Sequence, residues 1–335
     1  MITNSFQPYL RRVEVLVGPL SELMGGGSKG EALRFYGDGT NNNFRIAFSV
    51  NKQLPTTCTP TSISIYNLSP GTRSTLHVPK TAPPIDLIQN GAKVVLNVGW
   101  ENGDLVQVFQ GTMLSCYSQR QGPDIITTMM SLAGAGDLVS SITPSPFTRL
   151  GEGGPTSIGS GNDTSSTFVK GQSVSEIVYV LATNFPSIAV DKKNIVIKEY
   201  NLGSAGWTFA GPVAEGLDKL SRQYGFSWWI DNGKFYAKDD KTAFPTQNVI
   251  SSSNGLLLRA EPMLTGPFSQ NIGASIYSLL NPYIDLGTQV KLESEINADL
   301  NGYYTPYSIR HTGDTHSDQW TTAIETQWYN MAGAL

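Results

Sequence analysis

The chain has 335 residues, a formal net charge of −4 and 15% charged residues, against about 25% in an ordinary soluble domain. Its length accommodates two or three domains, and its mild charge gives no sign of the clustered basic face that binds nucleic acid. We find no signal peptide, and no apolar run approaches the ~18 residues of a membrane helix, so we expect no membrane partner. A surface poor in charge but rich in Ser, Thr, Asn and Gln suits a subunit covered by others, although secreted β-proteins look similar.

Short alternating segments separated by Gly, Pro, Asn and Asp fill the first part of the chain. With no confident long helix among them, they predict an antiparallel barrel or sandwich. We place this first tube-like β-barrel at residues 1–145. The expected strands are Arg11–Val17, Leu33–Tyr36, Phe44–Val50, Ser62–Asn67, two arms within Lys93–Gln121, and Asp124–Ser131.

The two arms within Lys93–Gln121 meet at Asn102-Gly103. Asn-Gly between β-rich runs is the strongest short-range hairpin signal, because a type I′ turn needs positive φ at both central residues. We therefore predict a two-residue turn there, with Gly103 intolerant of a side chain.

Residues 146–247 read as a Gly/Ser linker followed by an inserted α+β module. The stretch 151–166 has almost nothing apolar to bury. Ser173–Ala182 has helical apolar spacing, with Glu176 three residues after Ser173 as in a capping box. Pro212–Tyr224 predicts a second helix that Gly225 ends.

A second Asn-Gly pair, Asn232-Gly233, predicts a hairpin within this module. It joins Phe226–Ile230 to Lys234–Ala237. Trp228 and Trp229 are adjacent on one strand, so one is expected in the module's core and the other against a neighbouring surface.

Residues 248–335 return to strands and repeat features of the first part. Ser64-Ile65-Tyr66-Asn67-Leu68 resembles Ser275-Ile276-Tyr277-Ser278-Leu279. Val95 precedes Phe109 by 14 residues, as Val290 precedes Tyr304, and the next intervals, to Ile125 and to Trp320, are both 16. These spacings predict a duplicated β-unit, and hence a second tube-like barrel.

Chemically suggestive motifs are few. His311, Asp314, His316 and Asp318 have metal-ligand types, but a polar turn between two strands explains them as well. Gly26-Gly27-Ser28-Lys29-Gly30 matches a nucleophile elbow without its strand and helix context. Gly134-Ala135-Gly136-Asp137 lacks the Lys-Ser/Thr of a phosphate loop.

The two cysteines, Cys58 and Cys116, both lie near predicted strands and could meet in a disulfide, but without a secretory context we expect two buried thiols. We assign no catalytic, cofactor-binding or metal residues and no cofactor.

Several segments together resemble the baseplate hub proteins of contractile-tailed bacteriophages, which are related to late-control-D proteins and to the N-terminal part of type VI secretion spike proteins. The matching segments are Ser62–Leu68, Val94–Gly99, Phe109-Gln110-Gly111, Leu279–Gly287 and Tyr307–Asp314. The linker at 151–166 has no counterpart in the family and is expected to be a disordered loop or a contact arm.

The resemblance implies a mainly β chain with two tail-tube-like antiparallel barrels and a smaller α+β insert. It implies a structural virion protein, a homotrimer that joins a hexameric tail tube to a trimeric central spike in the baseplate, assembled in the host cytoplasm. Tail tube protein, spike protein, surrounding baseplate proteins and DNA passing through the lumen would be its partners. A tail-associated cell-wall hydrolase, a tail tube subunit and a secreted β-protein are the alternatives.

Overall fold

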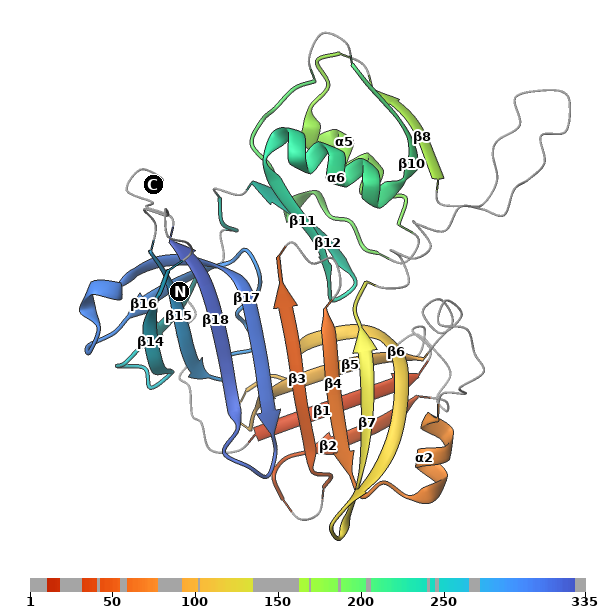
Figure 1. Cartoon of the computed structure of the whole chain (residues 1–335), viewed down its shortest axis with the longest axis vertical. Helices are drawn as coiled ribbons and strands as arrows, with labels where there is room; N and C mark the ends of the chain where they lie inside the picture. The colour runs from red at the N-terminus through yellow and green to blue at the C-terminus, as the bar shows by residue number, and fades with distance from the viewer. Residues whose placement is uncertain are drawn as a thin grey trace, which may run out of the picture.

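The computed structural model describes residues 11–18, 32–40, 43–54, 59–77, 92–101, 103–134, 163–168, 170–185, 188–202, 206–239, 242–244, 247–264 and 272–328. In these residues the chain is mainly β, with three α-helices and one sheet of 13 strands (Figure 1). The main path of the sheet runs β14-β15-β18-β17-β3-β4-β7-β6-β5-β1-β2, and β13 and β16 attach beside β17. No described helix is long and apolar enough to cross a membrane.

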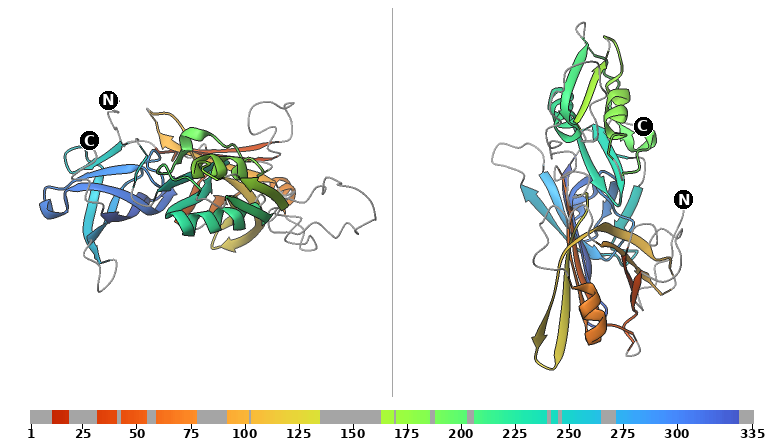
Figure 2. Two further views of the ribbon diagram at one scale, coloured as in Figure 1. Left: turned by 90° about the horizontal axis from the view of Figure 1, so that it is seen from above. Right: turned by 90° about the vertical axis from the view of Figure 1, so that its right-hand side faces the viewer.

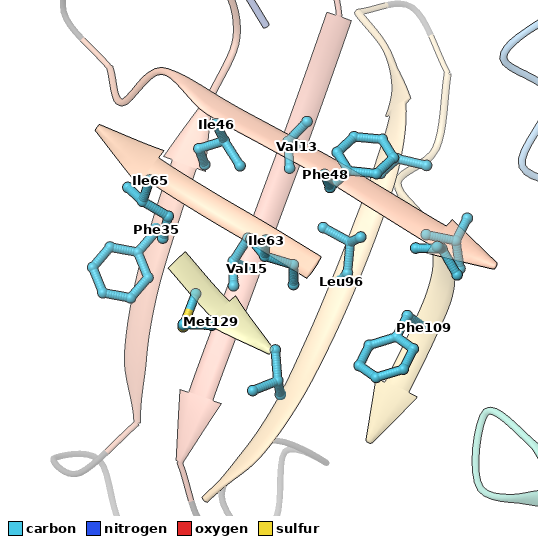
Figure 3. Packing of buried hydrophobic residues seen from close by; sticks show 14 of the residues in the cluster. Val13, Val15, Phe35, Ile46, Phe48, Ile63, Ile65, Leu96, Phe109 and Met129 are labelled. Atoms are coloured by element: carbon cyan, nitrogen blue, oxygen red, sulfur yellow. The ribbon is translucent and has the colours of Figure 1, made fainter. Parts of the chain in front are cut away.

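The first half of the sheet folds back on itself. Strands β1, β2 and β5 cross behind β3, β4 and β7 (Figure 1), and valine, isoleucine and phenylalanine side chains fill the space between the two layers (Figure 3). Alternation explains this core, since every second residue of β3 and β4 is buried. Its elements are β1 (Arg11–Gly18), β2 (Leu33–Gly37), β3 (Ile46–Gln53), β4 (Pro60–Tyr66), α2 (Pro70–Leu76), β5 (Lys93–Trp100), β6 (Val106–Gln121) and β7 (Asp124–Leu132).

The second half repeats the topology of the first. Its order β16-β17-β18-β15-β14 matches β5-β6-β7-β4-β3 strand for strand, which supports the duplicated unit that the spacings predict. A separate buried cluster lies within it. Its elements are β13 (Gln247–Ser251), β14 (Leu257–Leu264), β15 (Ile272–Leu279), β16 (Gln289–Glu293), a 3-10 turn at Ala298–Leu300, β17 (Gly302–Asp314) and β18 (Trp320–Trp328).

The two halves join through main-chain pairing. Strand β17 pairs with β16 over Gly302–Tyr304, runs on, and then pairs with β3 over Ser308–Asp314. Because this extension continues the sheet into the first half, the path through the described strands does not close into a barrel in either half. Two separate closed barrels, as predicted, are therefore not what the described strands form.

The inserted module stands above the junction of the two halves (Figures 1 and 2). Its own apolar cluster draws on both helices and both small sheets. Its elements are β8 (Asp163–Phe168), α5 (Val174–Ala182), a 3-10 turn at Lys192–Asn194, β9 (Ile195–Val196), β10 (Trp207–Pro212), α6 (Val213–Tyr224), β11 (Phe226–Asp231) and β12 (Lys234–Asp239).

The two Asn-Gly predictions fare differently. Asp231 pairs directly with Lys234, so two residues turn the chain, and Asn232 (φ 49°) and Gly233 (φ 71°) have the positive φ of a type I′ turn. The first hairpin forms, but its last pair is Val98 with Val106, which leaves a longer loop. Gly103 has no positive φ there, so the tight turn predicted at this point is wrong; Asn102 lies outside the described residues.

Two further predictions about the insert are corrected. Ser173 makes no side-chain cap bond, and Glu176 instead pairs with Lys192 at 2.8 Å, so the capping box does not form. Residues 163–166 belong to β8, which pairs with β10, so the linker ends earlier than expected. Main-chain hydrogen bonds to a neighbouring strand can hold Ser and Thr residues in a strand, and the polar composition of 163–166 gave no sign of this pairing.

Candidate functional site

One broad face of the sheet remains open across both halves. Residues opposite each other on paired strands point to the same side. Ile309, Lys52 and Ile324 occupy one side of β17, β3 and β18, with the cores, so their neighbours Arg310, Asn51 and Ala323 point to the other side. Applied from β14 to β6, the register gives one continuous face over eight strands.

This open face is built mainly of small, uncharged polar side chains. Its few charged side chains include Arg310, which donates to Asn51 Oδ1 at 2.7 Å, Arg259, which pairs with Glu261 at 3.3 Å, and the exposed Glu325. Such a face offers smooth, weakly interacting surface rather than a binding pocket. It includes Ser275, Tyr277, Thr321, Ala323, Ser308, Thr312, Ala47, Ser49, Ser62, Ser64, Tyr66, Met130, Ser115, Tyr117 and Gln119.

The structure separates the residues that could have held a metal. His311 is buried, with Nδ1 2.9 Å from Thr322 Oγ1, whereas His316 is exposed and contacts the neighbouring Thr315. Asp314 binds Arg45, the residue before β3, at 2.7 Å, and Asp318 is exposed. No group of three or more His, Cys, Asp or Glu in the described part of the chain could hold a metal ion.

Asp314 instead fastens the two halves together. Burial acts to raise the pKa of its carboxyl, but hydrogen bonds from Arg45 and from the His316 amide outweigh burial and hold the pKa below its usual value. The Arg45 guanidinium also lies 4.4 Å from the centre of the Tyr66 ring. A residue predicted as a possible ligand thus serves the joint between β17 and β3.

A buried charge cluster lies where all three parts of the chain meet. Lys52 Nζ of β3 contacts Asp231 Oδ2 of the insert at 2.6 Å and Asp285 Oδ1, in the turn after β15, at 3.2 Å. The side chains of Lys52 and Asp231 are 3% and 1% exposed, and that of Asp285 is 32% exposed. His311 and Tyr236 approach the same charges from β17 and β12.

Burial and the like charge of Asp285 raise the pKa of Asp231 to about 7, against the opposing attraction of Lys52. The pKa of Lys52 is also raised: burial lowers it, but the two carboxylates outweigh that effect. Burial, assisted by Lys52, lowers the pKa of His311 to about 3. Near neutral pH the cluster thus holds one ammonium, a neutral imidazole and up to two carboxylates.

We did not identify this cluster from the sequence. One signal was visible: Lys52 continues the inward series Ile46, Phe48 and Val50 of β3, and a lysine at a core position needs an anionic partner. The partners come from positions 231 and 285, which no local spacing links to 52.

Of the remaining motifs, Gly26–Gly30, Cys58 and all of Gly134–Asp137 except Gly134 lie outside the described residues. Cys116 is buried, and burial raises the pKa of its thiol to about 11, so it is a poor nucleophile.

Residues 162–326 match the family model described as Baseplate hub gp41. No curated protein matches the chain.

Solved structures with a similar fold include the tail protein from Neisseria meningitidis MC58, at 13% identity and a TM-score of 0.56, over 96% of this chain and 97% of that one. The 43 kDa tail protein of prophage MuSo2 from Shewanella oneidensis has 11% identity and a TM-score of 0.54, over 93% and 96% of the two chains. The E. coli c3393 protein, described as a type VI secretion component similar to T4 tail proteins gp27 and gp5, has 8% identity and a TM-score of 0.52, over 86% and 75%.

The solved structures show that the chain shares its fold with two tail proteins and a type VI secretion component. The family model on residues 162–326 confirms the resemblance to baseplate hub proteins that the sequence motifs indicate.

Proposed function

We propose that this protein is the central hub of a contractile-tail baseplate, a structural virion protein without catalytic activity. As a homotrimer it joins a hexameric tail tube to a trimeric central spike and lines the channel through which DNA passes during host entry. The observation that carries the proposal is the strand-to-strand joining of two sheet halves with the same topology.

Residues 1–145 and 248–335 are the two tube-like units, and residues 146–247 are the insert between them. A tube of six-fold symmetry meets six equivalent units, and a chain with two such units supplies six as a trimer. The repeated strand order supports the equivalence of the two units.

The joint within the chain suggests how neighbouring copies meet. Strand β6 runs past β5 as β17 runs past β16, and each has a bulge where the extension begins, at Met113/Ser115 and at Pro306/Ser308. The extension of β17 pairs with β3, and the strand that corresponds to β3 in the second half is β14. The extension of β6 in one copy therefore pairs with β14 of the next, and three such contacts close a ring.

The open face lines the channel in this arrangement. Its side chains are mainly small and uncharged, which gives DNA phosphates little to bind and suits passage without retention. The insert lies on the outside of the ring and contacts surrounding baseplate proteins.

Two measurements test the proposal. Light scattering should give the mass of three chains, either for the free protein or after assembly with its tube and spike partners; a stable six-fold hexamer of this chain in the assembled state contradicts the hub. A photo-crosslinking residue in place of Tyr117, which is half exposed on the β6 extension, should capture peptides from 257–264 of another copy.

The matched control places the same crosslinker at Tyr283, which is equally exposed but lies in the turn after β15. If the protein is a trimer but position 117 captures no β14 peptide, the trimeric hub stands and the proposed pairing of β6 with β14 of the next copy is wrong.

A further inference from the structure

The hairpin β11–β12 enters the junction of the three parts of the chain with its turn first. Its residues Trp228, Ile230 and Phe235 belong to the core of the insert. Trp229 and Tyr236, on the opposite side, pack in the core of the second half of the sheet. Gly233 at its tip lies against Gln110 of β6. The hairpin thus contacts both halves of the sheet from the insert.

Asp231 ends the first strand of this hairpin, and its ion pair with Lys52 lies at the centre of that contact. Lys52 in turn belongs to β3, the strand by which the two halves join. One ammonium group therefore ties the insert to the joint and, through Asp285, to the turn after β15.

The charges in this cluster are unequal. Lys52 supplies one positive charge, and Asp231 and Asp285 supply two negative charges when both are ionised. A buried carboxylate and a partly exposed one facing a single buried ammonium disfavour full ionisation, and one proton on Asp231 balances the cluster.

We propose that Lys52, Asp231 and Asp285 form a proton-dependent latch that fixes the insert on the sheet junction: one bound proton tightens it, and loss of that proton loosens the hairpin without unfolding either sheet half. The latch depends on the contacts within one chain, so it stands whether or not the trimeric hub is correct.

The direction with pH follows from proton binding. Latched Asp231 holds its proton to a higher pH than Asp231 exposed to water, so rising pH favours the open form. His311 works in the opposite direction, because burial keeps it neutral where a solvated imidazole would take up a proton. Lys52, Asp285 and Tyr236 are the other groups facing Asp231, and all three, with His311, are retained when Asp231 alone is changed.

The test measures amide hydrogen exchange across β11–β12 in the full chain, comparing the wild type with Asp231→Asn at each pH. The ratio removes the chemical pH dependence of exchange. The latch predicts that wild-type protection of the hairpin falls at least tenfold relative to Asp231→Asn between pH 5 and pH 7. Amides in β4 and β7 should keep a constant ratio.

Lys52→Met is a second test of the latch, because it removes the ammonium that pairs with Asp231 and Asp285. Hairpin exchange should accelerate at least tenfold at pH 7, and adding Asp231→Asn should recover part of the loss. Lys219→Met, which removes the solvent-exposed pair with Glu215 on α6, is the matched control and should change neither region.

Asp231→Asn retains a balanced Lys52–Asp285 pair, so it tests the proposal even where Lys52→Met fails to fold. A wild-type to Asp231→Asn ratio that does not change with pH overturns the proton-dependent latch. A change of equal size in β4 and β7 overturns it as well, because the cluster would then act on global stability.

Discussion

Gly233 is constrained by its backbone and by its surroundings together. Its φ of 71° lies in the left-handed region, where a β-carbon costs roughly 1–2 kcal/mol. An added β-carbon would also lie 3.0 Å from Gln110 Nε2, at the contact between the insert and the first half of the sheet. Gly103 has neither constraint, since nothing closer than the Trp100 carbonyl oxygen, at 3.7 Å, would meet its β-carbon.

This difference gives a matched pair of variants. Gly233→Val should lower the free energy of unfolding by at least about 2 kcal/mol, from the strained turn plus the lost fit to Gln110. Gly103→Val should stay within about 0.5 kcal/mol of the wild type. Urea denaturation of the full chain measures both, and equal losses would show that the turn geometry assigned here is wrong.

At the scale of the elements, the hairpin β11–β12 contributes to two cores, because its strands have two apolar faces. Trp228 stacks on Phe235 in the insert core, with 6.0 Å between ring centres. Trp229 stacks on Tyr236 at 5.5 Å and meets Phe244 edge-on. The sequence prediction that the two tryptophans serve different surfaces is confirmed.

Truncation of each tryptophan should therefore destabilise a different region of the protein. Each change to Ala removes a large buried side chain and should cost about 3–5 kcal/mol. Trp228→Ala should loosen α5 and α6, which hydrogen exchange would report in the insert. Trp229→Ala should leave those helices protected and increase exchange in the hairpin and in β13–β16. The same exchange pattern in both variants would contradict the separation of the two cores.

Local sequence patterns predict single elements but not the long-range pairing between them. Apolar spacing and Gly225 were enough to predict α6, and Gly225 indeed ends it with a φ of 71°. Alternation likewise predicted strands at Phe44–Val50 and Ser62–Asn67, where β3 and β4 lie. Alternation within a strand does not identify its neighbouring strands. The pairing of β17 with β3, between residues 255 to 267 positions apart, was therefore not predicted, and closed barrels were expected in its place. The Lys52 cluster depends on that joint and was missed for the same reason.

At the scale of the whole molecule, the open face spans strands from both halves without a break. Ser62 and Ser49 lie opposite each other near its middle, and both are partly exposed. Their side chains are short, so a larger charged residue fits without disturbing the buried side of the sheet.

Ser62→Lys should leave folding unchanged, within about 0.5 kcal/mol, since it alters an accessible position. If the face lines a DNA channel, a ring of added ammonium groups should attract phosphates and slow DNA passage at low salt, with recovery as salt rises. Ejection kinetics of particles carrying the variant would measure this. The control is Lys219→Met on the insert, and normal ejection with Ser62→Lys would place the open face elsewhere.

The pairing of β3 with β17 also determines when the first half of the sheet can be completed during translation. Strand β3 leaves the ribosome some 260 residues before β17. The edge of β3 that pairs with β17 therefore stays unpaired while the insert and most of the second half are made. Unpaired edges invite pairing with other chains, and domains formed early are exposed to it longest. Nascent chains halted before residue 308 should therefore aggregate or engage chaperones, and both effects should end once residues 308–314 are available to pair with β3.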